Sequence, residues 1–292
     1  MRVLIIGADG QLGRTLALTA PASWKVSGYG SAECDIVTAD LTERLAAADA
    51  EVVINAAAYT AVDRAQSEEG RARAFAVNEI GAGRLAQACA ARGARLVHVS
   101  TDFVFDGRAG SPYQPGAEPH PLGVYGASKL AGEQRVEAAL PAAAIVRTAW
   151  VYSRFGHNFV KTMLRLMSER DEVGVVCDQV GTPTWTVSLA EVLWALAAQP
   201  TLSGSYHFTD AGAASWYDFA VAIQEEALAL GLLERAVPVR PIRSVDYPTP
   251  AARPAYSVLD KTATYHDLAC EPVHWRVALR RMLTDYRDHL NG

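Results

Sequence analysis

The side chains best suited to chemistry lie in two neighbouring segments. Residues 100–107 read Ser-Thr-Asp-Phe-Val-Phe-Asp-Gly, which is typical of a strand that ends in a turn at its Asp-Gly pair. Residues 124–129 read Val-Tyr-Gly-Ala-Ser-Lys and open a predicted helix. Tyr125 and Lys129 are four positions apart, so this helix would place both side chains on one face, about one turn apart.

A phenol beside an ammonium group suits the reduction of a carbonyl. The charge of Lys129 would stabilise phenolate, lower the pKa of Tyr125 and let its hydroxyl exchange protons near neutral pH. Thr101 offers a second hydroxyl that could hold the carbonyl oxygen beside the phenol. A Tyr and a Lys at this spacing also meet by chance in many helices. The prediction of Tyr125, Lys129 and Thr101 as catalytic residues therefore depends on the other motifs.

A nucleotide-binding turn is predicted near the N-terminus. Residues 2–6 form a short apolar run rich in β-branched side chains, typical of a buried parallel strand, and residues 14–20 follow a helical pattern. Between them, Gly7, Gly10 and Gly13 would let the backbone approach a pyrophosphate at the start of the helix, where free N–H groups point outward. The spacing is GxxGxxG rather than GxGxxG, a weak signal that its place between strand and helix strengthens.

The sequence leaves the choice between NADH and NADPH open. A site specific for NAD usually carries Asp or Glu at the end of the second strand, where the carboxylate binds the ribose hydroxyls. Here the predicted strand at 25–29 runs into Gly-Ser-Ala, and the acids Glu33 and Asp35 come late. No clear arginine for a 2′-phosphate follows, although Arg14 lies near the glycine turn. Asp35 and Ile36 either flank the adenine or belong to a polar loop.

Strands alternate with helices along the first half of the chain, which predicts the fold that would hold these motifs. Runs at 51–58, 94–100 and 144–148 are expected strands, and 68–92 and 125–139 are expected helices. This order favours an α/β fold, a doubly wound, Rossmann-like parallel sheet with a smaller C-terminal α/β substrate lobe. The predicted dinucleotide-binding domain covers 1–149 and a returning segment near 173–199. The predicted substrate domain covers 150–172 and 200–292.

Composition and charge limit the classes of partner. The chain has 292 residues, of which 50% are hydrophobic and 20% charged, with a net charge of −5 and no basic block. Nucleic acid is therefore not an expected partner. Four scattered cysteines without a CxxC pair are typical of a reduced cytoplasmic protein. No apolar run reaches the roughly 18 residues of a membrane span, and no signal peptide is expected.

The motifs together resemble the extended branch of the short-chain dehydrogenase/reductase superfamily, and within it the family of dTDP-4-dehydrorhamnose reductases. The matching segments are 7–13, 55–63, 100–107, 124–126 with 129–133, 147–152, 158–163, 178–179 with 181–184, and 248–254. The resemblance implies reduction, with NADPH or NADH, of the C4 ketone of dTDP-4-dehydro-6-deoxy-L-mannose to dTDP-L-rhamnose. The implied pathway is the biosynthesis of dTDP-rhamnose.

The resemblance also implies roles in the reaction and in holding the cofactor. Tyr125 would donate the proton, Lys129 would lower the pKa of Tyr125 and hold the ribose, and Thr101 would bind the keto oxygen. Asn78 would lie against the site and orient Lys129 through water, unless it is simply a tolerated polar residue. The implied cofactor contacts are Gly7, Gly10, Gln11, Leu12, Gly13, Asp35, Ile36, Ala58, Tyr59, Thr60, Val99, Tyr125 and Lys129.

The same resemblance implies that Thr101 and three further residues contact the sugar nucleotide. The three are Asp102, Trp150 and Arg253. Arg253 would bind the diphosphate, because a guanidinium fork suits phosphate better than an ammonium does. The alternative for Arg253, and for Arg240 and Arg243 nearby, is a solvated loop arginine.

Two positions depart from relatives, and they bear on the alternatives. Some members of the family pair through a metal held by carboxylates, one of them just after the glycine turn, where this chain has Thr15. No metal site is therefore predicted, and the chain is expected to be a monomer or a homodimer. Related dehydratases carry an acid directly after Thr-Asp, where this chain has Phe103.

Three other functions stay open on the sequence. One is the reduction of a related dTDP-4-keto-6-deoxy sugar, and another is a sugar-nucleotide epimerase. The third belongs to a different class: a non-catalytic subunit similar to the regulatory subunit of methionine adenosyltransferase, which uses this kind of fold to bind a partner. The complete set of Thr101, Tyr125 and Lys129 argues against the third, although a fold does not fix a function.

Overall fold

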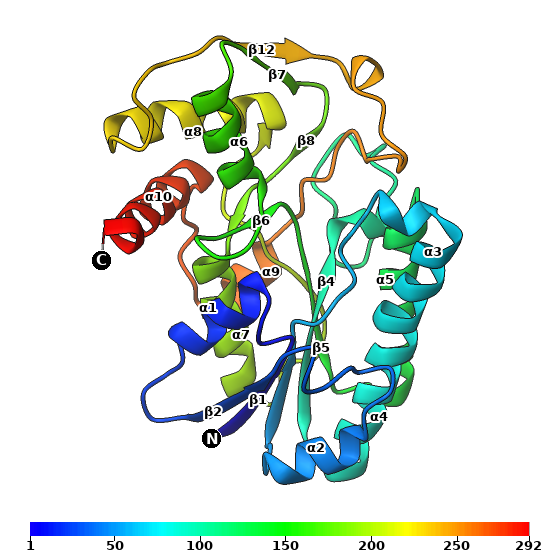
Figure 1. The fold of residues 1–292 in the computed structure, drawn as a ribbon. Coiled ribbons are helices and arrows are strands. Elements are labelled where there is room, and N and C mark those ends of the chain that lie inside the picture. The colour runs from blue at the N-terminus through cyan, green and yellow to red at the C-terminus, as the bar shows by residue number, and fades with distance from the viewer. Residues whose placement is uncertain (292) are drawn as a thin grey trace.

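A six-stranded parallel sheet forms the larger part of the molecule (Figure 1). The computed structural model describes residues 1–291, with side chains to residue 290. The strand order is β10-β5-β4-β3-β1-β2, and every neighbouring pair is parallel. The strands are β1 (Arg2–Ile6), β2 (Lys25–Tyr29), β3 (Val52–Asn55), β4 (Arg95–Thr101), β5 (Ala144–Thr148) and β10 (Gly204–His207).

Helices cover both faces of this sheet because both faces of its strands are apolar. Along β1, Val3 and Ile5 point to one face and Leu4 and Ile6 to the other. The first face packs on α1 (Gln11–Leu18), α7 (Thr186–Ala198) and α9 (Thr262–Leu268). The second packs on α2 (Leu41–Ala47), α4 (Ala82–Arg92) and α5 (Val124–Ala139). The predicted doubly wound parallel sheet is confirmed.

A smaller lobe stands above the carboxyl ends of the main strands in Figure 1. Its helices α6 (Phe159–Glu169), α8 (Trp216–Ala229) and α10 (Trp275–Asn291) share one apolar core. Three short strand pairs complete the lobe: β6 (Val151–Tyr152) with β9 (Thr184–Trp185), β7 (Val173–Val176) with β12 (Val239–Ile242), and β8 (Val180–Gly181) with β11 (Ala214–Ser215). Helix α8 begins at a capping box, in which Ser215 and Asp218 satisfy each other's backbone N–H groups.

Two boundaries of the predicted domain division are contradicted by strand pairing. The segment at 173–199 was expected to return to the dinucleotide-binding domain, but β7 pairs with β12 in the smaller lobe and only α7 packs on the main sheet. The segment from 200 onward was expected in the substrate domain, but β10 pairs with β5 and forms the edge of the main sheet. Short apolar runs carry no signal that tells one sheet from another, which is why the pattern missed both exchanges.

The expected helix at 68–92 is continuous but changes its winding. It consists of α3 (Glu68–Phe75), a π-helical segment (Ala76–Gly81) and α4. Such segments are rare and often lie at functional sites, since the wider turn redirects side chains. Here the π-helical segment contains Asn78 and lies against α5. Among residues 1–291, no helix is both long enough and apolar enough to cross a membrane.

Candidate functional site

The carboxyl ends of β1 and β3 open into a pocket of about 250 Å³. Ligands of doubly wound sheets bind at this edge, where chain connections leave the sheet in opposite directions. The lining residues are Gly7, Asp9, Gly10, Ser31, Cys34, Asp35, Ile36, Ala56, Ala57, Ala58, Tyr59, Arg73 and Val77. Six predicted cofactor residues are among them: Gly7, Gly10, Asp35, Ile36, Ala58 and Tyr59.

The turn after β1 has the geometry that a dinucleotide diphosphate requires. Gly7 has φ of +84°, which a residue with a Cβ adopts only under strain. A Cβ on Gly13 would lie 2.1 Å from the carbonyl oxygen of Gly7, so only glycine allows the helix to start so close to the strand. Gly10 caps α1 without a side-chain hydrogen bond, which leaves the first N–H groups of the helix free for an anion. The residues present therefore fit a bound dinucleotide.

The other predicted cofactor contacts fall into different environments. Leu12 is buried in the core beneath the turn, and Gln11 reaches away to the loop at 153–158. Asp35, one of the six predicted residues that line the pocket, forms an ion pair of 3.0 Å with Arg73, and hydrogen bonds from Val37 and Arg73 lower the pKa of its carboxyl. Thr60 is exposed and does not line the pocket.

The three predicted catalytic residues meet where β4 ends and α5 begins. Thr101 is the last residue of β4, and Tyr125 lies in the first turn of α5. The Tyr125 ring packs in one cluster with Tyr59 from the cofactor pocket and meets Phe103 edge-on at 5.5 Å. Lys129 is buried, and its Nζ donates a hydrogen bond of 2.6 Å to the carbonyl oxygen of Val99.

The pKa of Tyr125 contradicts one expectation from the sequence. Burial raises this pKa to about 12, a hydrogen bond with Thr101 lowers it in part, and the Asp102 carboxylate raises it further. Lys129 was expected to lower it, but its ammonium group is directed to the backbone of β4 instead. Burial in turn lowers the pKa of Lys129 to about 8, while Glu133 opposes that shift. In this arrangement Tyr125 is a neutral phenol at pH 7.

Asp102 and Asn78 support this centre from two sides. Asp102 is buried, and the loss of water raises the pKa of its carboxyl to about 6. Asn78 accepts a hydrogen bond of 2.8 Å from Tyr59 N and donates to Tyr59 O and to Ser128 Oγ. It thereby joins the loop that lines the cofactor pocket to the residue next to Lys129. Its predicted link to Lys129 through water stays a prediction.

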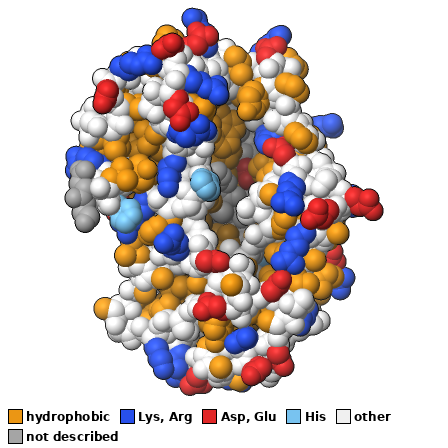
Figure 2. Space-filling model, in the orientation of Figure 1, with side chains coloured by type: hydrophobic (Ala, Val, Ile, Leu, Met, Phe, Trp, Pro, Cys, Tyr) orange, Lys and Arg blue, Asp and Glu red, His pale blue; other side chains and the backbone are white. Residues whose placement is uncertain are grey.

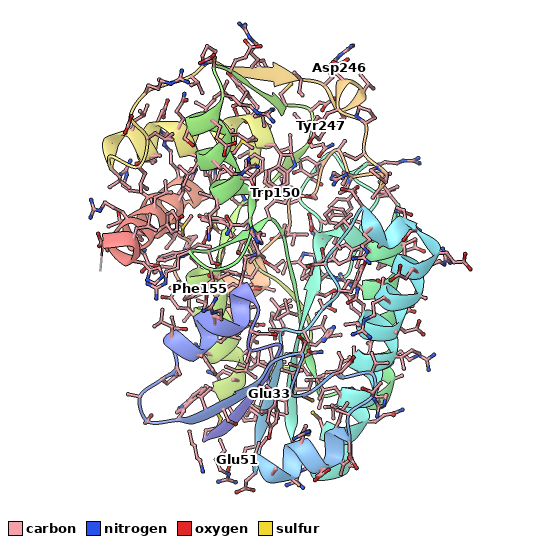
Figure 3. The ribbon with its side chains drawn as sticks, viewed as in Figure 1. Glu33, Glu51, Trp150, Phe155, Asp246 and Tyr247 are labelled. Atoms are coloured by element: carbon pink, nitrogen blue, oxygen red, sulfur yellow. The ribbon has the colours of Figure 1, made fainter. Side chains whose placement is uncertain are left out.

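A second and larger pocket, of about 530 Å³, lies in the smaller lobe. Figure 2 shows a hollow between the two lobes on this face of the molecule. The walls include Phe159, Thr162, Arg165, Leu166, Arg170, Gln179, Trp216, Tyr247, Thr249 and Arg253. Trp150 lies at the junction of the lobes (Figure 3), stacked on Trp216 with ring centroids 3.5 Å apart. Trp150 has φ of +48°, an uncommon backbone conformation for a residue other than glycine.

Arg253 lies in the wall of this larger pocket and is tied to the main sheet. Its Nη2 is 2.7 Å from Asp63 Oδ2, in the loop that follows β3. The side chain is 25% exposed, so it remains accessible from the pocket. Arg240 in β12 and Arg243 just after it, by contrast, are exposed and pair with Glu172 and Asp246, so both are solvated arginines.

Several residues of the larger pocket were missed by reasoning from the sequence. Phe159, Met163, Leu166 and Met167 form an apolar stripe on α6, the pattern expected of core. Met163 and Met167 are buried, yet Met163 lines the pocket together with Phe159 and Leu166. Trp216 and Tyr247 gave no signal, because nothing local tells an aromatic wall from an aromatic core.

The sequence predicted no metal site. Among residues 1–291, no three His, Cys, Asp or Glu side chains are grouped to hold a metal ion. Thr15, which follows the glycine turn, is buried, and its Oγ1 lies 2.8 Å from Thr186 Oγ1.

The fold and these residues define a class of protein. A doubly wound sheet with a glycine turn after β1, and a Thr, Tyr and Lys set between β4 and α5, characterise the extended short-chain dehydrogenase/reductases. The family model described as the RmlD substrate binding domain matches residues 1–288. The chain therefore belongs to the RmlD family. Several proteins similar to this chain are dTDP-4-dehydrorhamnose reductases.

Individual relatives match over nearly their whole length. The dTDP-4-dehydrorhamnose reductase of Aggregatibacter actinomycetemcomitans is 42% identical, covering 96% of this chain and 98% of the relative. That of Mycobacterium tuberculosis (strain ATCC 25618 / H37Rv) is 44% identical, covering 97% and 92%. The crystal structure of the Bacillus anthracis str. Ames enzyme in complex with NADP has a TM-score of 0.91 at 36% identity, covering 97% of this chain and 99% of that one.

Proposed function

We propose that this chain reduces the C4 ketone of dTDP-4-dehydro-6-deoxy-L-mannose and so forms dTDP-L-rhamnose. The observation that carries the proposal is the meeting of Thr101, Tyr125 and Lys129 beside a pocket built for a dinucleotide. The names of relatives at more than 40% identity support the same substrate and product. NADPH or NADH, when bound, supplies the hydride for the ketone carbon.

The chain's own residues handle the ketone oxygen and its proton. A carbonyl that gains a hydride becomes an alkoxide and needs a donor at oxygen. Tyr125, kept protonated by its raised pKa, is that donor, and the Thr101 hydroxyl holds the oxygen beside the phenol. An alkoxide is far more basic than a phenolate, so the transfer is downhill even from a phenol with a pKa of about 12. Lys129, whose ammonium group is held against the carbonyl oxygen of Val99, offers its remaining N–H groups to the cofactor ribose.

The larger pocket fits the nucleotide part of the substrate. Trp216, Tyr247 and Phe159 offer aromatic faces for a thymine ring, and Arg253 offers a guanidinium fork for the diphosphate. Trp150 stacks on Trp216 of this pocket, and the Asp102 carboxylate acts on the phenol of Tyr125, so these two residues would contact a sugar that bridges the two lobes.

The alternatives lose support at particular residues. An enzyme that removes a proton beside the ketone needs a base next to the phenol. Here Phe103 occupies that place with its ring edge-on to Tyr125. A non-catalytic subunit needs no acid beside the cofactor pocket, whereas here the phenol of Tyr125 packs with Tyr59 of that pocket. A reductase of a related dTDP-4-keto-6-deoxy sugar differs only in the sugar, so that alternative is decided by the substrate test.

The test is an assay of NADPH and NADH oxidation with enzymatically made dTDP-4-dehydrorhamnose. We expect one nicotinamide oxidised for each dTDP-L-rhamnose formed, with the product identified by mass spectrometry and NMR. Conversion of the sugar without net oxidation would indicate the epimerase. No conversion, together with capture of a partner enzyme, would indicate the non-catalytic subunit. We place the reaction in the cytoplasm, since the four cysteines are free thiols.

A further inference from the structure

Asp9 supplies the carboxylate that the end of β2 lacks. The strand ends at Tyr29 and continues into Gly30 and Ser31, so it has no acid of its own for the ribose hydroxyls. Asp9 Oδ2 accepts hydrogen bonds from Ser31 N at 3.2 Å and from Ser31 Oγ at 3.1 Å. A Cβ on Gly30 would lie 3.0 Å from Asp9 Cγ, so the carboxylate sits directly against this strand end.

A second carboxylate strengthens the negative field at this place. Glu33, labelled in Figure 3, follows β2, and its Oε2 accepts a hydrogen bond of 3.0 Å from Gly30 N. Asp9 lines the cofactor pocket together with Ser31. Two carboxylates therefore flank the turn against which the adenosine ribose of a dinucleotide binds in this fold.

The basic side chains near this pocket are engaged elsewhere. Arg73 is the one basic residue among the described residues that line it, and it pairs with Asp35 at 3.0 Å. Arg44 packs over the ring of Tyr29, with its Cζ 5.5 Å from the ring centroid. Arg14, which lies near the glycine turn in sequence, packs over Phe155 with its Cζ 4.8 Å from the centroid. None of the three is aimed at the Asp9 carboxylate.

We propose that Asp9 makes this chain prefer NADH to NADPH. A carboxylate at the end of the second strand accepts hydrogen bonds from the ribose hydroxyls, whereas a 2′-phosphate would bring like charges together. Asp9 plays this part from the turn after β1, and so it was invisible to a search at the end of β2. The inference rests on the proposed function, because it concerns the cofactor of that reaction.

Direct binding of the two dinucleotides tests the preference without turnover. Fluorescence titration of the wild-type protein with NADH and NADPH, without sugar, should give a Kd for NADH at least tenfold below that for NADPH. Asp9→Asn keeps the size and the acceptor for Ser31 but removes the charge. It should lower the Kd for NADPH at least fivefold and raise the Kd for NADH less than threefold. The matched control is Glu137→Gln, which removes an equal charge from an exposed position late in α5 and should leave the ratio within twofold.

Each result decides the matter. Equal affinities in the wild type, a preference for NADPH, or a ratio that Asp9→Asn leaves unchanged would overturn the inference while leaving the reductase proposal intact. Failure to bind either dinucleotide would overturn both. Asp9→Ser, which also removes the charge, serves if the Asn variant loses its thermal unfolding transition. The ratio of kcat/KM for NADH and NADPH with the keto sugar should follow the binding ratio.

Discussion

The ammonium group of Lys129 donates a hydrogen bond of 2.6 Å to the backbone carbonyl of Val99, and so joins α5 to β4. The side chain is 1% exposed, which makes it one of the largest fully buried side chains of the described protein. The contact fixes the first turns of α5 against the strand that ends in Thr101. Lys129 is therefore held in the fold by the same atom that the proposed function assigns to the cofactor.

Replacing Lys129 by Met should change the pH dependence of stability. The pKa of the lysine is about 8 when folded and near 10.5 when unfolded, so the unfolded chain binds more protons between these values. The free energy of unfolding of the wild type should therefore rise over this range relative to Lys129→Met, by up to about 3 kcal/mol. Denaturant unfolding of both proteins at pH 7.5 and pH 10 measures the difference. Lys25→Met, at an exposed position on β2, should show no such change. If the free energies of unfolding of wild type and Lys129→Met differed by the same amount at both pH values, the pKa of Lys129 would not be lowered in the folded protein.

Replacing Tyr125 by Phe should abolish proton donation and leave the packing of the ring unchanged. The ring would keep its contacts with Phe103 and Tyr59. We expect kcat to fall by on the order of a hundredfold or more, within the range of general acid catalysis, with dinucleotide affinity and thermal stability retained. Single-turnover oxidation of the reduced nicotinamide, followed by absorbance, is the measurement. Tyr217→Phe in α8 is the control, and near-normal turnover in Tyr125→Phe would remove the phenol from the mechanism.

The sequence predicted those features that depend on local pattern. The glycine turn, the β-branched runs and the Tyr–Lys pair each lie within a few residues, where backbone geometry alone decides what the side chains can do. The sheet followed from the alternation of strands and helices. The direction of the Tyr125 pKa shift did not follow, because it depends on burial by segments that meet only in the folded protein.

The missed features all join distant parts of the chain. Asp9 meets Ser31 across two elements, and Arg253 meets Asp63 across 190 positions of sequence. The pairing of β7 with β12 likewise brings residue 173 beside residue 239. Such contacts form only when the whole core packs, and one sequence carries no signal of which loops will face each other.

Arg253 should contribute to sugar-nucleotide binding and little to stability. The ion pair with Asp63 is partly exposed, at 25% and 41%, so its loss should cost about 1 kcal/mol of stability or less. We expect Arg253→Met to raise the Kd for dTDP and the KM for the keto sugar at least tenfold, while the Kd for the dinucleotide stays within twofold. Calorimetric titration with dTDP is the direct measurement. Arg240→Met removes an equal charge from an exposed pair with Glu172 and should bind dTDP normally. If both variants bound dTDP with equal affinity, Arg253 would be a solvated arginine without a role in binding the diphosphate.

The buried ion pair between Glu133 and Arg147 should contribute more to the free energy of unfolding than any exposed ion pair. Their Oε2 and Nη2 atoms are 2.7 Å apart, and both side chains are nearly buried, at 5% and 6% exposure. Removing one partner leaves an uncompensated buried charge, so Glu133→Ala should lower the free energy of unfolding by about 3–5 kcal/mol. The double variant Glu133→Gln with Arg147→Met should recover part of this loss. Arg135→Ala, which breaks an exposed pair with Glu79, should cost less than about 1 kcal/mol. A loss for Glu133→Ala as small as the Arg135→Ala loss would mean that Arg147 is hydrated rather than buried.

Gln11 and Asn158 should couple the two pockets. Gln11 Oε1 accepts a hydrogen bond of 2.9 Å from Asn158 Nδ2, while Asn158 Oδ1 caps α6 by accepting from Lys161 N at 3.1 Å. Helix α6 lines the larger pocket, and Gln11 belongs to the glycine turn, so ordering of the turn by a dinucleotide should be felt at the dTDP site. We expect saturating NADH to lower the Kd for dTDP several-fold in the wild type, and the reciprocal effect to have the same size.

The substitution Asn158→Asp separates this coupling from helix stability. Aspartate keeps the acceptor that caps α6 but has no N–H to donate to Gln11, so the thermal unfolding temperature should change little while the effect of NADH on the Kd for dTDP falls to within twofold of none. Asn158→Ala loses both functions and should in addition cost about 1 kcal/mol, the usual worth of a helix cap. If Asn158→Asp keeps the full coupling, the coupling does not depend on the hydrogen bond between Gln11 and Asn158, and the contacts of Gln11 with Ser153 Oγ and His157 O would carry it instead.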